Sequence, residues 1–206
     1  KVYDIQKNYF DMEYVAGKSF DEFFSIASVN DIEFVISTLF DYFDTLISTA
    51  RNIDATKQIL DKLDSLKEKS SYPKYIEFLR KYVEDRRIIV PHTFCHGDLT
   101  FANIIFHKNR LFFIDFLDCY VDTFLSDLVK LKQDLHHLWA VRNQDVYSNR
   151  IHQIYQYIWD KLEVRYEPYL KEGFHILDVI NALRIEPYLT SDFQRVILEG
   201  LSLIHI

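Results

Sequence analysis

The residues whose types and spacing best fit a chemical role are Asp98, Asn103 and Asp115. Asn103 follows Asp98 by five residues, and Asp115 follows Asn103 by twelve. An Asp carboxylate can orient a hydroxyl nucleophile and accept its proton, while Asn and Asp supply the hard oxygen ligands that Mg²⁺ prefers. This set therefore predicts phosphoryl transfer from ATP, with Asp98 as the catalytic base and with Asn103 and Asp115 as Mg²⁺ ligands.

The stretch between the two expected metal ligands indicates a β-hairpin, because two short apolar runs within 104–114 flank a polar turn. A turn centred on Asn109 places residues 103 and 115 directly opposite each other. Opposed residues in an antiparallel pair have Cβ atoms about 5 Å apart. We therefore expect both ligands side by side, with Asp98 on the loop just before the hairpin. The alternative is an ordinary hairpin flanked by a solvated Asp and Asn.

The motif His-Gly-Asp-Leu-Thr-Phe-Ala-Asn at 96–103, followed by Ile-Asp-Phe at 114–116, resembles the aminoglycoside phosphotransferase and choline kinase superfamily. These proteins are small-molecule kinases with a protein-kinase-like fold. They have His-Gly-Asp where protein kinases have His-Arg-Asp. The resemblance implies the same roles for Asp98 and the two metal ligands. It also implies that His96 braces the loop and that Asp127 supports it through hydrogen bonds without taking part in the chemistry.

The stretch at 9–17 resembles the hinge between the two lobes of these kinases, where the carbonyl of Glu13 and the N–H of Val15 would bind the adenine edge. The alternative is an ordinary apolar run ending in glycine. A complete kinase of this class also needs an N-lobe with a phosphate-covering loop and a Lys. Few residues precede the hinge, and no glycine-rich loop can be written from four glycines. We therefore expect residues 1–17 to be the end of an N-lobe and the hinge, the rest of the N-lobe to be missing, and residues 1–206 alone to be inactive.

Apolar residues with helical spacing dominate the rest of the chain. The expected helices start at the Ser19–Glu22 capping box and lie at 31–50, 54–69, 74–83, 125–139, 149–164, 174–183 and 192–198. A short strand at 88–90 leads into the catalytic loop, which we place at 95–118. The sequence thus predicts an α+β, predominantly helical fold with a small catalytic β-hairpin, and the family resemblance implies that residues 18–200 form a protein-kinase-like C-lobe. Residues 201–206 match the translation of a common sequencing adapter, so we expect a non-native tail there.

The composition is that of a globular domain, with 49% hydrophobic residues. A net charge of −7 argues against a nucleic-acid-binding surface. There is no apolar run long enough for a membrane helix and no signal-peptide pattern. We expect a cytoplasmic protein whose partner is a small-molecule hydroxyl acceptor; the oligomeric state is left open. The cysteines, Cys95 and Cys119, have no spacing typical of a disulfide framework or a metal site.

The acceptor stays open between an aminoglycoside, another sugar, choline and an amino-acid-like alcohol. Acidic side chains around the site, among them Asp118, Asp122 and Asp134, favour a cationic or polyhydroxylated acceptor, and a solvated acidic face is the alternative. Two other functional classes are an atypical protein kinase and a catalytically silent kinase-like binding module. His-Gly-Asp, and Leu117 in place of the Gly of Asp-Phe-Gly, argue against a protein kinase. The intact acidic and amide set argues against a silent module.

Overall fold

The structure is a computed structural model that describes residues 2–5, 10–12, 14–141 and 149–188. The described part is predominantly helical with three two-stranded antiparallel sheets, an arrangement compatible with the predicted α+β class. The α-helices are α1 (Phe20–Ile26), α2 (Val29–Ser48), α3 (Thr56–Lys67), α4 (Pro73–Glu84), α5 (Phe124–Leu135), α6 (Asn149–Tyr166) and α7 (Glu172–Ile185). The strands are β1 (Val2–Ile5), β2 (Phe10–Met12), β3 (Arg51–Asp54), β4 (Ile89–His92), β5 (Ile104–Phe106) and β6 (Leu111–Phe113). The 3-10 helices are η1 (Phe101–Asn103), η2 (Trp139–Val141), η3 (Glu167–Tyr169) and η4 (Glu186–Tyr188).

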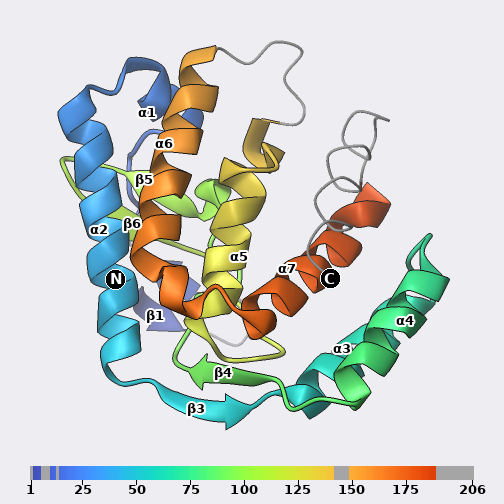
Figure 1. The fold of residues 1–206 in the computed structure, drawn as a ribbon. Helices are drawn as coiled ribbons and strands as arrows, with labels where there is room; N and C mark the ends of the chain where they lie inside the picture. Colours follow the sequence, from blue (N-terminus) through green and yellow to red (C-terminus); the bar gives the residue numbers. More distant parts are fainter. Residues whose placement is uncertain (1, 6–9, 13, 142–148, 189–206) are drawn as a thin grey trace.

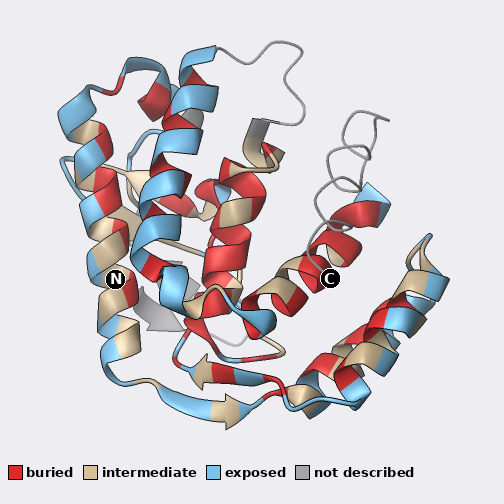
Figure 2. Ribbon diagram, viewed as in Figure 1, coloured by how far each residue is buried: buried red, intermediate tan, exposed pale blue. Residues whose placement is uncertain are grey.

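The centre of the molecule is a bundle in which α2, α5 and α6 lie side by side, with α7 packed against α5 (Figure 1). Helix α2 illustrates the cause, because its buried residues Ile32, Val35, Leu39 and Phe43 recur every three or four positions and form one apolar stripe. The Ser28 side chain caps the start of this helix. Figure 2 shows that the buried faces of these helices are turned toward one another.

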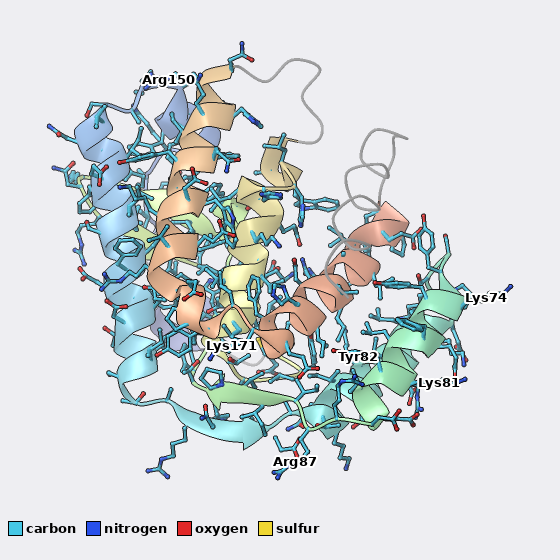
Figure 3. The ribbon with its side chains drawn as sticks, in the orientation of Figure 1. Lys74, Lys81, Tyr82, Arg87, Arg150 and Lys171 are labelled. Atoms are coloured by element: carbon cyan, nitrogen blue, oxygen red, sulfur yellow. The ribbon has the colours of Figure 1, made fainter. Side chains whose placement is uncertain are left out.

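The N-terminal end of α6 is fastened to α1. The guanidinium of Arg150 donates to the carbonyl of Phe24 at 3.2 Å and also to that of Ala27, at the C-terminal end of α1 where carbonyls lack helical partners (Figure 3). The ring of Phe24 in turn packs against those of Phe101 and Tyr155, with centroid distances of 5.5 and 5.7 Å. These contacts tie α1 to α6 and to η1.

A second helical unit, the α3–α4 hairpin, is joined to the bundle through the sheet of β3 and β4, and α3 also packs against α7 (Figure 1). In this sheet Asp54 lies opposite Ile89. The Asp54 carboxylate accepts from the backbone N–H of Thr56 at 3.1 Å and from its hydroxyl at 2.6 Å. The predicted helix at 54–69 therefore begins two residues later than expected, because Asp54 ends a strand and caps the helix from outside.

The segment 14–18 lies against the β5–β6 hairpin. Lys18 forms an isolated β-bridge with Phe106, in which the Lys18 N–H donates to the Phe106 carbonyl at 3.0 Å. A side chain at Gly17 would prevent this approach, because a Cβ there would lie 2.2 Å from Cγ2 of Ile105 and 2.6 Å from the Phe106 carbonyl oxygen. The glycine that ends the predicted hinge thus allows this segment to reach the hairpin.

The helices predicted within the described residues are present, with shifts at their ends. Three predictions lie outside the described residues: the adenine contact of Glu13, the helix at 192–198 and the tail at 201–206. The division into a hinge at 1–17 and a C-lobe at 18–200 stays a prediction. Among the described helices, none combines the length and the apolar character needed to cross a bilayer.

Candidate active site

The loop that carries Asp98, residues 93–103, connects β4 to the hairpin and is fixed at both ends. At its start the Thr93 N–H donates to the Asp122 carbonyl at 3.1 Å. At its end the Phe101 N–H donates to Oδ2 of Asp134, a side chain of α5 that is buried. Because Asp134 is bound to the backbone in this way, it acts as a support for η1.

Helix α5 also holds the middle of this loop through Asp127. The fully buried Asp127 carboxylate accepts the N–H of His96 at 2.7 Å and the N–H of Gly97 at 2.9 Å. The hydroxyl of Tyr42, on α2, donates to the same carboxylate at 2.8 Å. Burial raises the pKa of Asp127, and the three donors oppose this shift by stabilising the ionised form. Hydrogen bonds to the loop are what the family resemblance implied for Asp127.

Gly97 is the residue that allows two chain segments to meet at the loop. Its φ is +86°, and a Cβ built on it would lie 2.0 Å from the carbonyl oxygen of Leu117. The two segments are joined there by the Leu117 N–H, which donates to the His96 carbonyl at 2.8 Å. Both the left-handed backbone and the close approach require glycine, which gives the His-Gly-Asp motif a physical basis in this chain.

His96 is fully buried and links the loop to the residues around Asp115. Its ring lies on that of Phe116, with centroids 4.2 Å apart, and meets Phe113 edge-on at 6.4 Å. Its Nδ1 accepts the backbone N–H of Asp98 at 3.3 Å. His96 thus contacts both the backbone of Asp98 and the rings beside Asp115; its bracing role stays a prediction.

The Asp98 side chain is held by two donors from different elements. Its Oδ1 lies 2.8 Å from Nζ of Lys130, on α5, and its Oδ2 accepts from Nδ2 of Asn103 at 3.1 Å. The same Asn103 nitrogen also donates to the Asp98 carbonyl at 2.8 Å. The side chain of Lys130 is 9% exposed and that of Asp98 29%, so the carboxylate is the part of this ion pair that solvent and ligands can reach.

The expected register of the hairpin is wrong by one residue. Strands β5 and β6 pair with Ile104 opposite Phe113, so Asn103 lies opposite Ile114, whose N–H donates to the Asn103 carbonyl at 3.0 Å. The cause is the turn: Lys108 and Asn109 both have positive φ, of 45° and 56°. These are the two central residues of a two-residue turn, in which the hairpin axis passes between positions 108 and 109 instead of through 109.

Asp115 is consequently displaced from the position that we expected. It follows Ile114, is exposed, and has a φ of +58°, a conformation that Asp tolerates better than most residues. Because Asp115 has a left-handed backbone conformation, the alternation of side chains along the strand ends there. The strand register therefore does not fix where the Asp115 side chain lies relative to Asn103. The structure brings Asn103 into direct contact with Asp98, whereas Asp115 lies in the exposed segment after β6.

A cavity of about 930 Å³ opens beside the Asp98 carboxylate. Its walls include Val15 from the predicted hinge, Asp98 and Asn103 from the loop, and Arg184 from α7. Three of the predicted site residues are therefore brought together around one space, which is within the size range of ligand pockets. His96 and Asp127 stand behind the loop as its supports.

The two cysteines meet although their spacing predicted no pairing. Both are free thiols, and their sulfur atoms lie 2.8 Å apart, with Cys95 just before the Asp98 loop motif and Cys119 just after Leu117. The contact with Cys119 and burial raise the pKa of Cys95. This contact adds to the His96 hydrogen bond that holds the two segments together.

Sequence reasoning missed Lys130 and Tyr42. A local signal for Lys130 exists, because Asp127, Lys130 and Asp134 follow at i, i+3 and i+7 on a helix rich in Leu, Phe and Val and so share one face. A polar stripe on a buried helix face indicates side chains with partners inside the protein. Tyr42 has no such signal, since it lies on the amphipathic helix α2 and its role depends on how α2 meets α5.

Residues 36–165 match the Phosphotransferase enzyme family. The matched range contains the whole Asp98 loop, the hairpin and α5. It covers more than half of the 206-residue chain, so the chain belongs to this family, and the resemblance drawn from its motifs is confirmed. Neither the comparison with curated proteins nor that with solved structures gives a match.

Proposed function

We propose that this chain is the catalytic C-lobe of a cytoplasmic small-molecule kinase that transfers the γ-phosphate of ATP to a hydroxyl group. Membership of a phosphotransferase family supports the reaction class. The observation that carries the proposal is the setting of Asp98, a partly exposed carboxylate on the wall of a large cavity. It is held in place by Lys130 and Asn103.

This setting suits a general base. Each Asp98 oxygen receives one donor, and each therefore keeps lone-pair capacity for the hydroxyl of an acceptor. In the proposed step the acceptor oxygen bonds to the γ-phosphorus, the bond from that phosphorus to the leaving ADP oxygen breaks, and Asp98 takes the hydroxyl proton. Lys130 and Asn103 keep the carboxylate oriented throughout, which preserves the alignment of the nucleophile.

The expected Mg²⁺ ligands have suitable chemistry. Asn103 uses Nδ2 to bind Asp98, so Oδ1 is the atom that it would offer to a metal ion, and Asp115 would offer an exposed carboxylate. Bound Mg²⁺ would neutralise charge on the phosphates. The adenine contacts assigned to Glu13 and Val15 belong to the same proposal, and the position of Val15 in the wall of the Asp98 cavity supports its part.

The test uses the full-length gene product, Mg·ATP and a panel of alcohols, with ADP release and the mass of the phosphorylated product as readouts. Asp98→Asn should lower kcat by a factor of about 10² or more, while the Kd of Mg·ATP stays unchanged. Asp115→Ala should instead weaken Mg·ATP binding, and Asp85→Asn, at the exposed end of α4, is the control. Near-normal turnover of Asp98→Asn on a true acceptor would refute the base assignment, and unchanged Mg·ATP binding by Asp115→Ala would refute its metal role.

A further inference from the structure

Another cavity, of about 290 Å³, has Lys130 in its wall. It is enclosed by α3, α5, α7 and the segment 117–120, and Gly97 of the Asp98 loop forms part of its wall. Its three basic residues come from the three helices: Lys62 from α3, Lys130 from α5 and Arg184 from α7. We call this space the basic cavity.

The charges in the basic cavity are incompletely balanced. Lys130 is paired with Asp98. Within the described part of the chain, Lys62 and Arg184 form no ion pair with a carboxylate; Nζ of Lys62 lies 5.5 Å from the centre of the Tyr120 ring, and Arg184 donates to the amide oxygen of Asn181 at 3.2 Å. The acidic residue in the wall is Asp118, which is exposed.

Lys62 and Arg184 also repel each other. The pKa of Lys62 is lowered, mainly by burial and next by the positive charge of Arg184. Two like charges in a half-buried space repel each other, and an anion bound between them offsets this repulsion. Arg offers a planar fork of donors and Lys a point charge, a combination that suits carboxylate and phosphate groups.

The basic cavity is connected to the reacting groups. Arg184 lines both this cavity and the larger one that contains Asp98. Lys130 lines the basic cavity and touches the Asp98 carboxylate at 2.8 Å. An anion bound by Lys62 and Arg184 would therefore lie in a cavity that shares Arg184 with the Asp98 cavity and is lined by the lysine that contacts Asp98.

We infer that the basic cavity binds an anionic group, a carboxylate or a phosphate, of the alcohol whose hydroxyl reaches Asp98. This inference rests on the proposed kinase function and narrows its acceptor. An anionic acceptor is the opposite of the cationic one that the acidic residues of the sequence favoured. Asp134 already accepts a hydrogen bond from the Phe101 N–H, and basic side chains line the basic cavity. Choline or an aminoglycoside would bring further positive charge to Lys62 and Arg184.

The first experiment measures anion binding without nucleotide or Mg²⁺. Inorganic phosphate is titrated into the full-length gene product at constant ionic strength and followed by NMR of the Arg side-chain Nε–H signals. We expect a saturable shift of the Arg184 signal, and about tenfold weaker binding of phosphate by Lys62→Gln. Lys62→Arg should restore binding. The control is Lys81→Gln, on the outer face of α4 (Figure 3). Equal phosphate binding by wild type, Lys62→Gln and Lys81→Gln would overturn the inference.

The second experiment compares acceptors in matched sets: D-glycerate and glycerol 3-phosphate against glycerol, and L-homoserine against 3-aminopropanol and choline. We expect phosphorylation of a carboxylate- or phosphate-bearing alcohol, with KM raised about tenfold in Lys62→Gln and kcat changed less than about twofold. The preferred set identifies the anion. Phosphorylation of choline or of an aminoglycoside, with KM unchanged in Lys62→Gln, would overturn the anionic site and leave the kinase proposal intact. Phosphate binding that depends on Lys62, in a protein that phosphorylates no alcohol, would support the anion site and refute the kinase proposal.

Discussion

Replacement of Asp127 by alanine tests whether this carboxylate supports the Asp98 loop without taking part in the chemistry. The substitution leaves the backbone N–H groups of His96 and Gly97 without their acceptor, and the hydroxyl of Tyr42 loses its partner as well. An unsatisfied buried donor costs about 1–3 kcal/mol. Part of this cost is offset because a buried carboxylate, whose pKa is raised by burial, no longer has to be kept in the protein. The net loss of unfolding free energy should be about 3 kcal/mol.

For a chain of this length about 3 kcal/mol corresponds to a fall in Tm of about 6–12 °C. Urea and thermal unfolding followed by circular dichroism would measure it. Activity should fall too, because Asp98 follows directly after the two released N–H groups, although Asp127 touches no reacting atom. Tyr42→Phe, which removes one donor and keeps the two backbone bonds, should cost about 1 kcal/mol. Asp41→Ala, an exposed acidic residue on α2, should change stability by less than about 0.5 kcal/mol.

The competing interpretation is that Asp127 is an ordinary negative charge in the first turn of α5, worth about 0.3–1 kcal/mol through the helix dipole. A fall in Tm of only about one or two degrees, with intact activity, would refute the supporting role. A large fall in Tm with normal turnover of the remaining folded protein would show that Asp127 stabilises the fold without positioning Asp98.

Three further predictions follow from the same contacts. Gly97→Ala should lower the unfolding free energy in urea by about 2 kcal/mol or more, because its Cβ would lie 2.0 Å from a backbone oxygen at positive φ. Gly173→Ala should cost less, because its Cβ would lie 2.8 Å from a side-chain methyl of Val90 and its φ is not positive; equal costs would contradict the argument. Lys130→Met should reduce kcat about tenfold or more, with partial rescue by Lys130→Arg, and unchanged kcat would show that the ion pair is dispensable. Burial lowers the pKa of His136 to about 4. Below about pH 6.5 this side chain is therefore protonated in the unfolded chain but stays neutral in the folded protein. The unfolding free energy should therefore fall as the pH is lowered from about 6.5 toward 4. His136→Gln should reduce this slope of Tm against pH.

The helices could be predicted because their signals are local. The Ser19 side chain accepts the Glu22 N–H as the capping box predicts, and Pro73 occupies the first turn of α4. Apolar spacing marks the buried stripes of these helices in the sequence itself. Strand β3 gave no such signal, since Arg51–Asp54 has one apolar residue and becomes a strand only through its pairing with β4.

The hairpin shows the limit of local reasoning more sharply. Its strands were identified, but the register depends on whether the turn has an odd or an even number of residues. Lys108-Asn109 lacks the glycine that usually marks a two-residue turn, so the turn type is visible only in the positive φ of both residues. The error of one residue changed the expected relation between Asn103 and Asp115 from directly opposed to offset.

The charge around the acceptor is a property on which the residue count and the packing of the helices point in different directions. The chain carries a net charge of −7, and acidic residues are numerous near the Asp98 motif, so counting charges favoured a cationic ligand. In the fold Asp134 is bound to the backbone at Phe101, whereas Lys62 and Arg184 converge from helices that are distant in the sequence. The sign of a binding cavity is set by which side chains helix packing brings to its wall and which of them already have partners. A total charge contains neither piece of information, which is why an acidic protein can present a basic cavity beside its candidate catalytic base.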